Sequence, residues 1–453
     1  MTLEEAIYQK YIVPTQRPAG RYVGVELEFP LVNLRRRPVD VPAVQTVVRD
    51  FAERFGFTEQ RTDDGGNLYS MTEPATGDNV SFDCSYNTLE FSFGKEERIT
   101  ELDRRYRQYA GALQEGLRAC GHLLTGLGIH PYARYNEYEP IRNDRYRMLY
   151  HHLCAYKEWG GFFHHVPQFG MMAAASQVQL DVEEGVILQT LDVCNRLEPY
   201  KAILFANSFY DELPALSLAR DYLWGYSTQG YNPHNLGMYR RVPETLGEYV
   251  GYVKSQSIYC VQKEDKYLHF KPVPLYDYVT RDAVTGSYYA DGDWHTHTFR
   301  PDVEDLAHHR TFKFADLTYR GTIEYRSACE QPMQEAFTHA AFHAGLAECL
   351  DELGALLDAD TVLYHQGFDA AELRELMTYR ELPGVVDRTA LSRQLEAILK
   401  LAEKGLTRRG FGEEGYLAPL YARVQQLTNP ALMLLAGLEA GDAIETWIER
   451  YAI

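Results

Sequence analysis

The sequence lacks several features that would assign it to a common class of protein. It contains no run of about 18 apolar residues, so no segment is expected to span a membrane. Its seven cysteines are dispersed without a CxxC pair, which is typical of reduced thiols in a cytosolic protein rather than of a disulfide framework or a zinc site. The first residues, MTLEEAIYQKYIVPTQ, have no apolar stretch like that of a signal peptide, and we therefore expect a cytoplasmic location.

Positive charge is also scarce. The 453 residues include 45 Lys and Arg against 64 Asp and Glu, and the formal net charge is −19. Because nucleic acids and anionic membranes are themselves negative, this balance argues against either as a partner. A nucleotide substrate is still compatible with it, since bound cations can reverse the charge of a site locally. Neither GxxxxGK[ST] nor GxGxxG occurs, so we expect no P-loop and no Rossmann site.

The composition is that of a folded protein, with 45% hydrophobic and 13% aromatic residues. Residues 1–100 read mostly as strands and loops, residues 210–310 as loop-rich, and residues 333–453 as almost entirely helical. No internal repeat or low-complexity linker divides the chain. We predict one α+β unit over residues 1–453, with the helical part 333–453 packed on it. The pattern carries no information on oligomeric state.

Several short segments alternate apolar and polar residues. In YVGVELEF, Glu26 and Glu28 face the same way, because side chains in a strand change face at every residue. The other segments of this kind are VSFD with Asp83, TLEFSF with Glu90, QVQLDV with Gln179 and Asp181, and TIEYR with Glu324 and Arg326. An antiparallel sheet with one packed and one solvated face produces such alternation without any functional reason.

The residue types on the polar side favour a cation site over an ordinary solvated face. Exposed faces usually mix charges of both signs, whereas these segments carry six carboxylates and one arginine. Carboxylates brought together in one sheet repel unless a cation lies among them. Oxygen ligands without His or Cys indicate Mg²⁺, or Mn²⁺, rather than zinc. Phosphoryl-transfer enzymes hold a triphosphate in this way.

The spacing of Asp83 and Glu90 requires a turn between them. Seven residues apart, they would lie on opposite faces of one straight strand. The intervening CSYNT contains turn-forming residues, and we expect a tight reversal there that returns both carboxylates to the same face.

Nine motifs along the chain resemble those of one enzyme family. In order, they are GVELEF, DCSYNTLEF, RYRMLY, MMAAASQVQLD, LFANS, LARDYLW, DWHTH, IEYRSA and GLTRRGFGEEGYLAPL. Together they resemble glutamate–cysteine ligases, especially the plant and proteobacterial type, and related carboxylate–amine ligases. The resemblance covers nearly the whole chain. It implies a glutamine-synthetase-like antiparallel sheet that curves into a funnel for ATP, magnesium and glutamate, surrounded by helices and followed by a helical C-terminal region.

The resemblance also implies roles for individual residues. The implied ligands of the magnesium ions are Glu26, Glu28, Asp83, Glu90, Gln179 and Glu324. Arg326, with Glu324 the implied catalytic pair, would hold the transferred phosphoryl group, because a guanidinium suits bidentate phosphate contacts. Arg220 would bind a substrate carboxylate.

The implied reaction joins the γ-carboxylate of glutamate to the amine of cysteine through a γ-glutamyl phosphate made from ATP, a step of glutathione biosynthesis. No cysteine of the protein is needed as a nucleophile. Ala173, Ala174 and Ala175 stand where the ligases carry bulkier or polar residues on the cysteine side, so one alternative is another amino acid or amine as acceptor, in a specialised pathway. A second alternative is a non-catalytic ligand-binding protein of the same fold.

Overall fold

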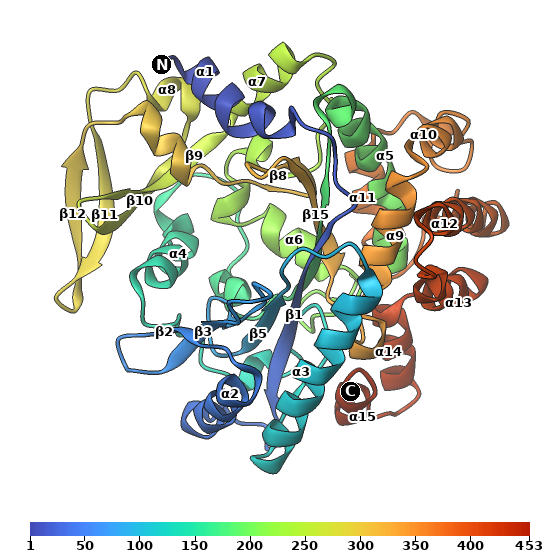
Figure 1. The fold of residues 1–453 in the computed structure, drawn as a ribbon, viewed down its shortest axis with the longest axis horizontal. Helices are drawn as coiled ribbons and strands as arrows, with labels where there is room; N and C mark the ends of the chain where they lie inside the picture. Colours follow the sequence, from blue (N-terminus) through green and yellow to red (C-terminus); the bar gives the residue numbers. More distant parts are fainter.

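The computed structural model describes residues 1–453, apart from the side chain at position 366. A large antiparallel sheet forms its centre (Figure 1). Its strands are β1 (Val23–Asn33), β2 (Glu59–Thr62), β3 (Leu68–Thr72), β4 (Asn79–Phe82), β5 (Thr88–Ser92), β6 (His122–Leu124), β7 (Ala175–Asp181), β14 (Ala315–Leu317) and β15 (Thr322–Cys329). Their order is β14–β15–β7–β1–β5–β4–β3–β2, and β6 pairs with the end of β1. The longest strand, β1, therefore lies in the middle, between β7 and β5.

A second, smaller antiparallel sheet stands beside the main one (Figure 1). Its strands are β9 (Ser257–Lys263), β10 (Lys266–Pro274), β11 (Val284–Ala290) and β12 (Asp293–Phe299), and the short strands β8 (Leu236–Gly237) and β13 (Phe312–Lys313) pair in parallel nearby. The sequence reading of residues 210–310 as loop-rich is therefore wrong for residues 257–299. The outer strand β12 is mostly exposed, so the apolar pattern that identifies a half-buried strand is weak there.

The helices lie on both sides of the main sheet. They are α1 (Leu3–Ile7), α2 (Val41–Phe55), α3 (Ile99–Ala119), α4 (Asp144–Cys154), α5 (Ile187–Phe205), α6 (Ala219–Gly225), α7 (Leu246–Ser255), α8 (Leu275–Tyr278), α9 (Thr338–Ala347), α10 (Leu350–Asp358), α11 (Ala370–Met377), α12 (Arg388–Arg409), α13 (Ala418–Gln426), α14 (Pro430–Glu439) and α15 (Ile444–Arg450). The predicted α+β class, with an antiparallel sheet and a helical C-terminal region, is confirmed. Among the described residues, no helix combines the length and apolarity needed to cross a membrane.

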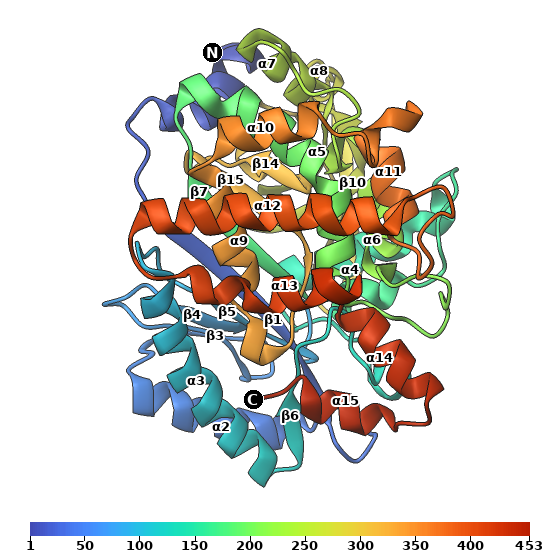
Figure 2. The ribbon, with the colours of Figure 1, turned by 90° about the vertical axis from the view of Figure 1, so that its right-hand side faces the viewer.

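The apolar face of the main sheet is covered by helices. Leu27 and Phe29 of β1 are fully buried, and the ring of Phe29 stacks on Tyr106 of α3 with centroids 5.8 Å apart. On β15, Tyr325 stacks on His343 of α9 at 3.9 Å. The C-terminal helices thus share one hydrophobic core with the sheet, and Figure 2 shows α9 and α12 lying across it.

Helix α12 is placed by its ends and by one close crossing. Asp387 caps its first turn by accepting from the N–H groups of Thr389 and Ala390, and Gly410, at φ 76°, ends it in the left-handed conformation. At the crossing with α9, a Cβ on Gly405 would lie 1.8 Å from the carbonyl oxygen of Gly345. Only glycine permits this approach, which holds α9 between α12 and the sheet.

Candidate active site

The strand register brings the polar side chains of the central strands together on one face. Glu28 of β1 lies directly opposite Glu90 of β5. On the other side of β1, Glu26 is opposite Gln177 of β7, and the next residue of β7 on this face, Gln179, is opposite Glu324 of β15. Like charges opposite each other in a sheet destabilise it, so this arrangement costs folding free energy unless something compensates it.

A tight turn adds Asp83 to this face. Cys84 adopts the left-handed conformation with φ 57°, and the N–H of Asp83 donates to the carbonyl of Thr88 at 3.2 Å. The expected reversal over CSYNT is therefore present. It leaves one carboxylate oxygen each of Glu28, Asp83 and Glu90 within 4.8 Å of one another, and we call these three residues the acidic cluster.

The acidic cluster is held from several directions. The two carboxylate oxygens of Glu28 accept from the N–H of Ala175 at 2.7 Å and from the side-chain amide of Gln177 at 2.9 Å. The Tyr146 hydroxyl, from α4, donates to Asp83 at 3.3 Å. Glu90 accepts from the hydroxyl of Ser92. These contacts fix the carboxylates without bringing any basic side chain into the cluster.

The second group of predicted residues lies on β7, β1 and β15. The amide of Gln179 donates to Glu324 at 2.9 Å and to Glu26 at 3.4 Å. Arg326 forms an ion pair with Glu324 at 3.2 Å and donates to the carbonyl of Thr311 at 3.1 Å. Asp181, also on this face, instead pairs with Arg17 at 3.0 Å and takes no part in either group.

Burial and mutual repulsion shift the protonation of these acids. Burial, reinforced by the charge of Glu324, raises the pKa of Glu26 to about 7. Burial and the neighbouring Asp83 raise the pKa of Glu28 to about 8. The pKa of Glu90 is raised well above its usual range, again by burial first and then by Glu26. A bound cation stabilises buried carboxylates that repel one another more than it stabilises exposed ones.

Oxygen atoms of this face fit a divalent cation. Besides the acidic cluster, the side-chain oxygen of Gln177 is buried and has no hydrogen-bond partner among the residues that the structure describes. Its amide nitrogen already contacts Glu28, which places this oxygen beside the cluster. An all-oxygen set of this kind suits Mg²⁺ or Mn²⁺.

Residues 22–445 match the family model described as glutamate-cysteine ligase family 2. The chain belongs to this family. The resemblance inferred from the nine motifs is confirmed. The chloroplastic glutamate–cysteine ligase of Medicago truncatula is 23% identical over 91% of this chain and 77% of that protein. The enzyme of Solanum lycopersicum is 27% identical over 88% and 72%. A solved glutamate–cysteine ligase of Francisella tularensis, in complex with AMP, matches with a TM-score of 0.48 and 10% identity over 95% of this chain and 87% of that one.

The comparison corrects the expected location. The plant relatives are chloroplastic enzymes, so the prediction of a cytoplasmic location for this member of the glutamate–cysteine ligase family is wrong by this comparison. The absence of a signal-peptide pattern and the dispersed cysteines bear on secretion, and they do not distinguish cytosol from plastid.

The predicted substrate arginine, Arg220, lies on α6 and is 9% exposed. Both terminal nitrogens of its guanidinium donate to the carbonyl of Arg326 at 3.4 Å, so the two arginines are neighbours. Their roles stay predictions.

A buried ion network supports Arg220. Arg374 of α11 pairs with Asp221, the residue after Arg220, at 2.7 Å and with Glu198 of α5 at 2.6 Å. It also donates to the carbonyl of Ser327, next to Arg326, at 3.3 Å. A side chain of the helical C-terminal part therefore joins the helix and the strand that carry the two predicted arginines.

The sequence suggests that the alanines of MMAAAS line the acceptor side of a substrate pocket, but they are largely buried. Ala174 and Ala175 are fully buried, and only Ala173 is partly exposed. The backbone N–H of Ala175 donates to Glu28. The effect of the three alanines on the acceptor pocket stays a prediction.

Sequence reasoning assigned no role in the acidic cluster to two residues that contact it. Gln177 alternates with Gln179 on the polar face, and this alternation was the signal that could have identified it. Glu330, fully buried, accepts from the backbone N–H of Glu28 at 2.8 Å and from that of Gln331 at 2.8 Å. No local pattern marks Glu330, because its contact depends on how the end of β15 passes β1.

Proposed function

We propose that this protein is an ATP-dependent ligase that joins the γ-carboxylate of glutamate to the amine of an amino acid, with cysteine as the first candidate acceptor. The observation that carries the proposal is the convergence of the acidic cluster, Glu26, Glu324 and Arg326 on one sheet face of a glutamate–cysteine ligase family chain. A divalent cation is part of this proposal, with Mg²⁺ preferred over Mn²⁺.

The chemistry requires activation of the carboxylate. An oxygen of the γ-carboxylate attacks the γ-phosphorus of ATP, the bond to the bridging oxygen breaks, and ADP leaves. The amine then attacks the acyl carbon of the γ-glutamyl phosphate. The C–O bond to phosphate breaks, the amine loses a proton, and an amide and inorganic phosphate result. No side chain needs to act as a nucleophile, so positioning and electrostatic stabilisation supply the catalysis.

The residues present fit these tasks. Cations held by the acidic cluster with Gln177, and by Glu26, Gln179 and Glu324, would neutralise phosphate oxygens and the charge that develops during transfer. Arg326 is fixed by Glu324 and Thr311, so its guanidinium is pre-oriented toward the same face. A fixed arginine there can bind the transferred phosphoryl group with little loss of side-chain entropy.

Cysteine is favoured as acceptor because the plant relatives carry the name glutamate–cysteine ligase. Another amino acid or amine is the second candidate, and it is supported by the small side chain of Ala173, the one partly exposed residue of the three alanines. A non-catalytic role fits less well, because a protein without catalysis or metal binding would gain nothing from carboxylates that repel one another.

The test measures phosphate release from ATP with Mg²⁺ and glutamate, adding each amino acid and common amine separately, and identifies the product by mass spectrometry. Release that depends on cysteine, with formation of γ-glutamylcysteine, supports the first candidate. Release with another acceptor supports the second. Glu324→Ala should abolish turnover, whereas Glu115→Ala on the exposed surface of α3 should not. No release with any acceptor would refute the proposal.

A further inference from the structure

The chain around β13 contacts Arg326 at three points. The guanidinium of Arg326 donates to the carbonyl of Thr311 at 3.1 Å and lies over the ring of Phe312 at 5.6 Å. Its backbone N–H donates to the carbonyl of Phe314 at 3.0 Å. The contact with Thr311 and the ion pair with Glu324 are both made by Nη1. The positions of these two residues therefore set the direction in which the rest of the guanidinium points.

A hydrogen bond from the Thr311 side chain fixes the carbonyl that Arg326 contacts. Thr311 lies just before β13 and outside the strands, so sheet pairing does not hold it. Its hydroxyl donates to the carboxylate of Asp316 on β14. Asp316 is directly opposite Glu324 on β15, the strand that carries Arg326. The hydroxyl thus ties the contact of Arg326 to the neighbouring strand.

Asp316 is itself anchored. Its carboxylate also accepts from the Tyr239 hydroxyl at 2.8 Å and from the N–H of Leu317 at 3.0 Å. The backbone of Tyr239 exchanges two hydrogen bonds, both 2.9 Å long, with the side-chain amide of Asn195 on α5. The ammonium of fully buried Lys313 lies over the Tyr239 ring at 4.3 Å. The carboxylate is therefore fixed to the core and can hold Thr311 in one position.

The hydrogen bonds of Asp316 favour a positioning role over a further cation ligand. Three donors of the protein already bind its two oxygens, and it is not a member of the acidic cluster. A carboxylate opposite Glu324 also adds repulsion to the sheet. This cost has a reason if the carboxylate orients a group of the site.

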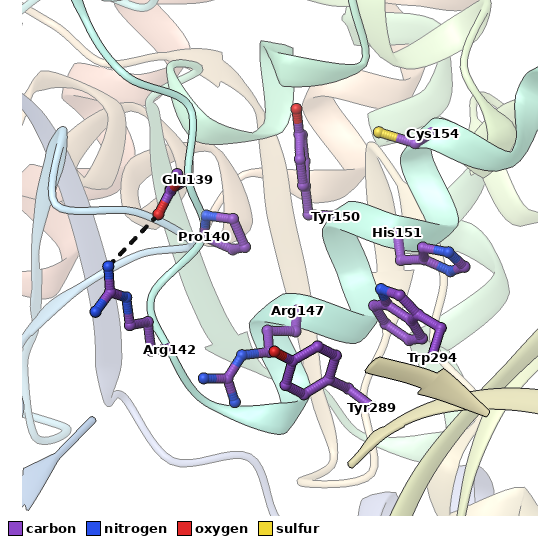
Figure 3. Close-up of a pocket in the computed structure, with 9 residues that line it drawn as sticks. All are labelled: Glu139, Pro140, Arg142, Arg147, Tyr150, His151, Cys154, Tyr289 and Trp294. Atoms are coloured by element: carbon purple, nitrogen blue, oxygen red, sulfur yellow. Dashed lines mark ion pairs between the residues drawn. The ribbon is translucent and has the colours of Figure 1, made fainter. Parts of the chain in front are cut away.

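The neighbouring ligand cavity does not involve this arrangement. A cavity of about 510 Å³ lies between α4 and the hairpin of β11 and β12 (Figure 3), where Arg147 and Trp294 line it. The described residues of its wall do not include Thr311, Asp316 or Arg326. Substitution of Thr311 therefore leaves the walls of this cavity unchanged, which separates an effect through Arg326 from an effect on ligand binding there.

We propose that the hydrogen bond from Thr311 to Asp316 orients the guanidinium of Arg326 for phosphoryl transfer, so that Thr311 and Asp316 are positioning residues. This inference rests on the proposed function, because the role of Arg326 in transfer is part of it. Groups that act on a transferred phosphoryl depend on the hydrogen bonds that hold them, and a displacement of about 1 Å can cost about 100-fold in rate.

The test removes only the hydroxyl. Thr311→Val has nearly the shape of threonine and keeps the backbone carbonyl, whereas Thr311→Ser restores the hydroxyl. Thr190→Val on α5 is the matched control, because the Thr190 hydroxyl likewise makes one hydrogen bond, to the carbonyl of Val186 at 2.8 Å. The readouts are kcat and KM for ATP and glutamate, with the acceptor that supports wild-type turnover. Mn²⁺ binding, followed by paramagnetic resonance, counts the folded sites.

Thr311→Val should lower kcat and kcat/KM equally, by about 10- to 100-fold, because the lost interaction acts in the transition state. KM values and the number of Mn²⁺ sites should not change. Thr311→Ser should recover most of the rate, and Thr190→Val should resemble the wild type. In an Arg326→Lys background, Thr311→Val should cost much less than it does in the wild type, because the guanidinium that it orients is gone.

A wild-type kcat in Thr311→Val, an equal loss in Thr311→Ser, or an undiminished loss in the Arg326→Lys background would overturn this inference and leave the proposed function intact. If Thr311→Val does not fold, Tyr239→Phe decides, because it removes another support of Asp316: a lowered kcat with unchanged KM supports the inference, and an unchanged kcat overturns it. A wild-type protein without turnover would overturn the proposed function, and this inference with it.

Discussion

Glu26→Gln should stabilise the metal-free protein at alkaline pH while it removes activity. Glu26 is half-buried on the polar face, and burial together with Glu324 raises its pKa to about 7 from an ordinary value of 4.5. The folded protein thus binds this proton more tightly than the unfolded chain does. The stability that the folded protein gains from tighter proton binding at Glu26 is fully present below about pH 4.5 and is lost as the pH rises through about 7.

The size of the effect follows from the shift. One pKa unit corresponds to about 1.4 kcal/mol, so ionised Glu26 costs the folded state about 3 kcal/mol at about pH 8 and less than about 1 kcal/mol at about pH 5. Glutamine has the same shape and stays neutral, and its oxygen can still accept from Gln179. The free energy of unfolding of the variant should therefore exceed that of the wild type by about 3 kcal/mol at about pH 8 and by less than about 1 kcal/mol at about pH 5.

The assay is urea denaturation in EDTA at several pH values between about 5 and 8, with Glu115→Gln as an exposed control. Adding Mg²⁺ should reduce the gain, because a cation stabilises the wild-type carboxylate. ATP turnover should fall by about 100-fold or more if Glu26 is a metal ligand. A Glu26→Gln variant that is less stable than the wild type at about pH 8, or a stability gain that does not change with pH, would show that the charged Glu26 carboxylate does not destabilise the fold.

Two further predictions concern charges elsewhere around the site. Arg374→Met should destabilise the protein by about 3–5 kcal/mol in denaturant, because Asp221 then loses its buried ion pair and Glu198 keeps only its ion pair with Lys201; a loss below about 1 kcal/mol would show that the network is not needed for folding. Asp83→Asn should weaken Mn²⁺ binding, measured by paramagnetic resonance, by at least about 10-fold. Asp181→Asn on the same sheet face should not, and equal effects of both variants would contradict a cation site at the acidic cluster.

The sequence predicts that Glu26 and Glu28 lie on one strand face, and that Glu324 and Arg326 do so as well, because this depends only on local geometry. Side chains two residues apart in a strand share a face in any sheet. The turn between Asp83 and Glu90 was predictable for a similar reason, since a reversal within seven residues involves no distant part of the chain. The ordered motifs then identified the family, although none of them describes a contact.

The small sheet over residues 257–299 could not be predicted in the same way. Strands β11 and β12 pair closely with each other, but their tyrosines, histidines and threonines are partly exposed, so no apolar stripe marks them. The pocket between Trp294 and Arg147 was equally hidden, because the two residues are far apart in the sequence and meet only when the hairpin packs against α4.

Which side chains share a strand face and which family the chain resembles can be learned from the sequence alone, because alternation and motif order are properties of a linear chain. Three features depend on tertiary folding: Glu28 faces Glu90, Gln177 and Glu330 contact Glu28, and Arg374 joins the segments that carry Arg220 and Arg326. Strand order, register and helix docking depend on burial of apolar surface across the whole core. No local pattern contains that information.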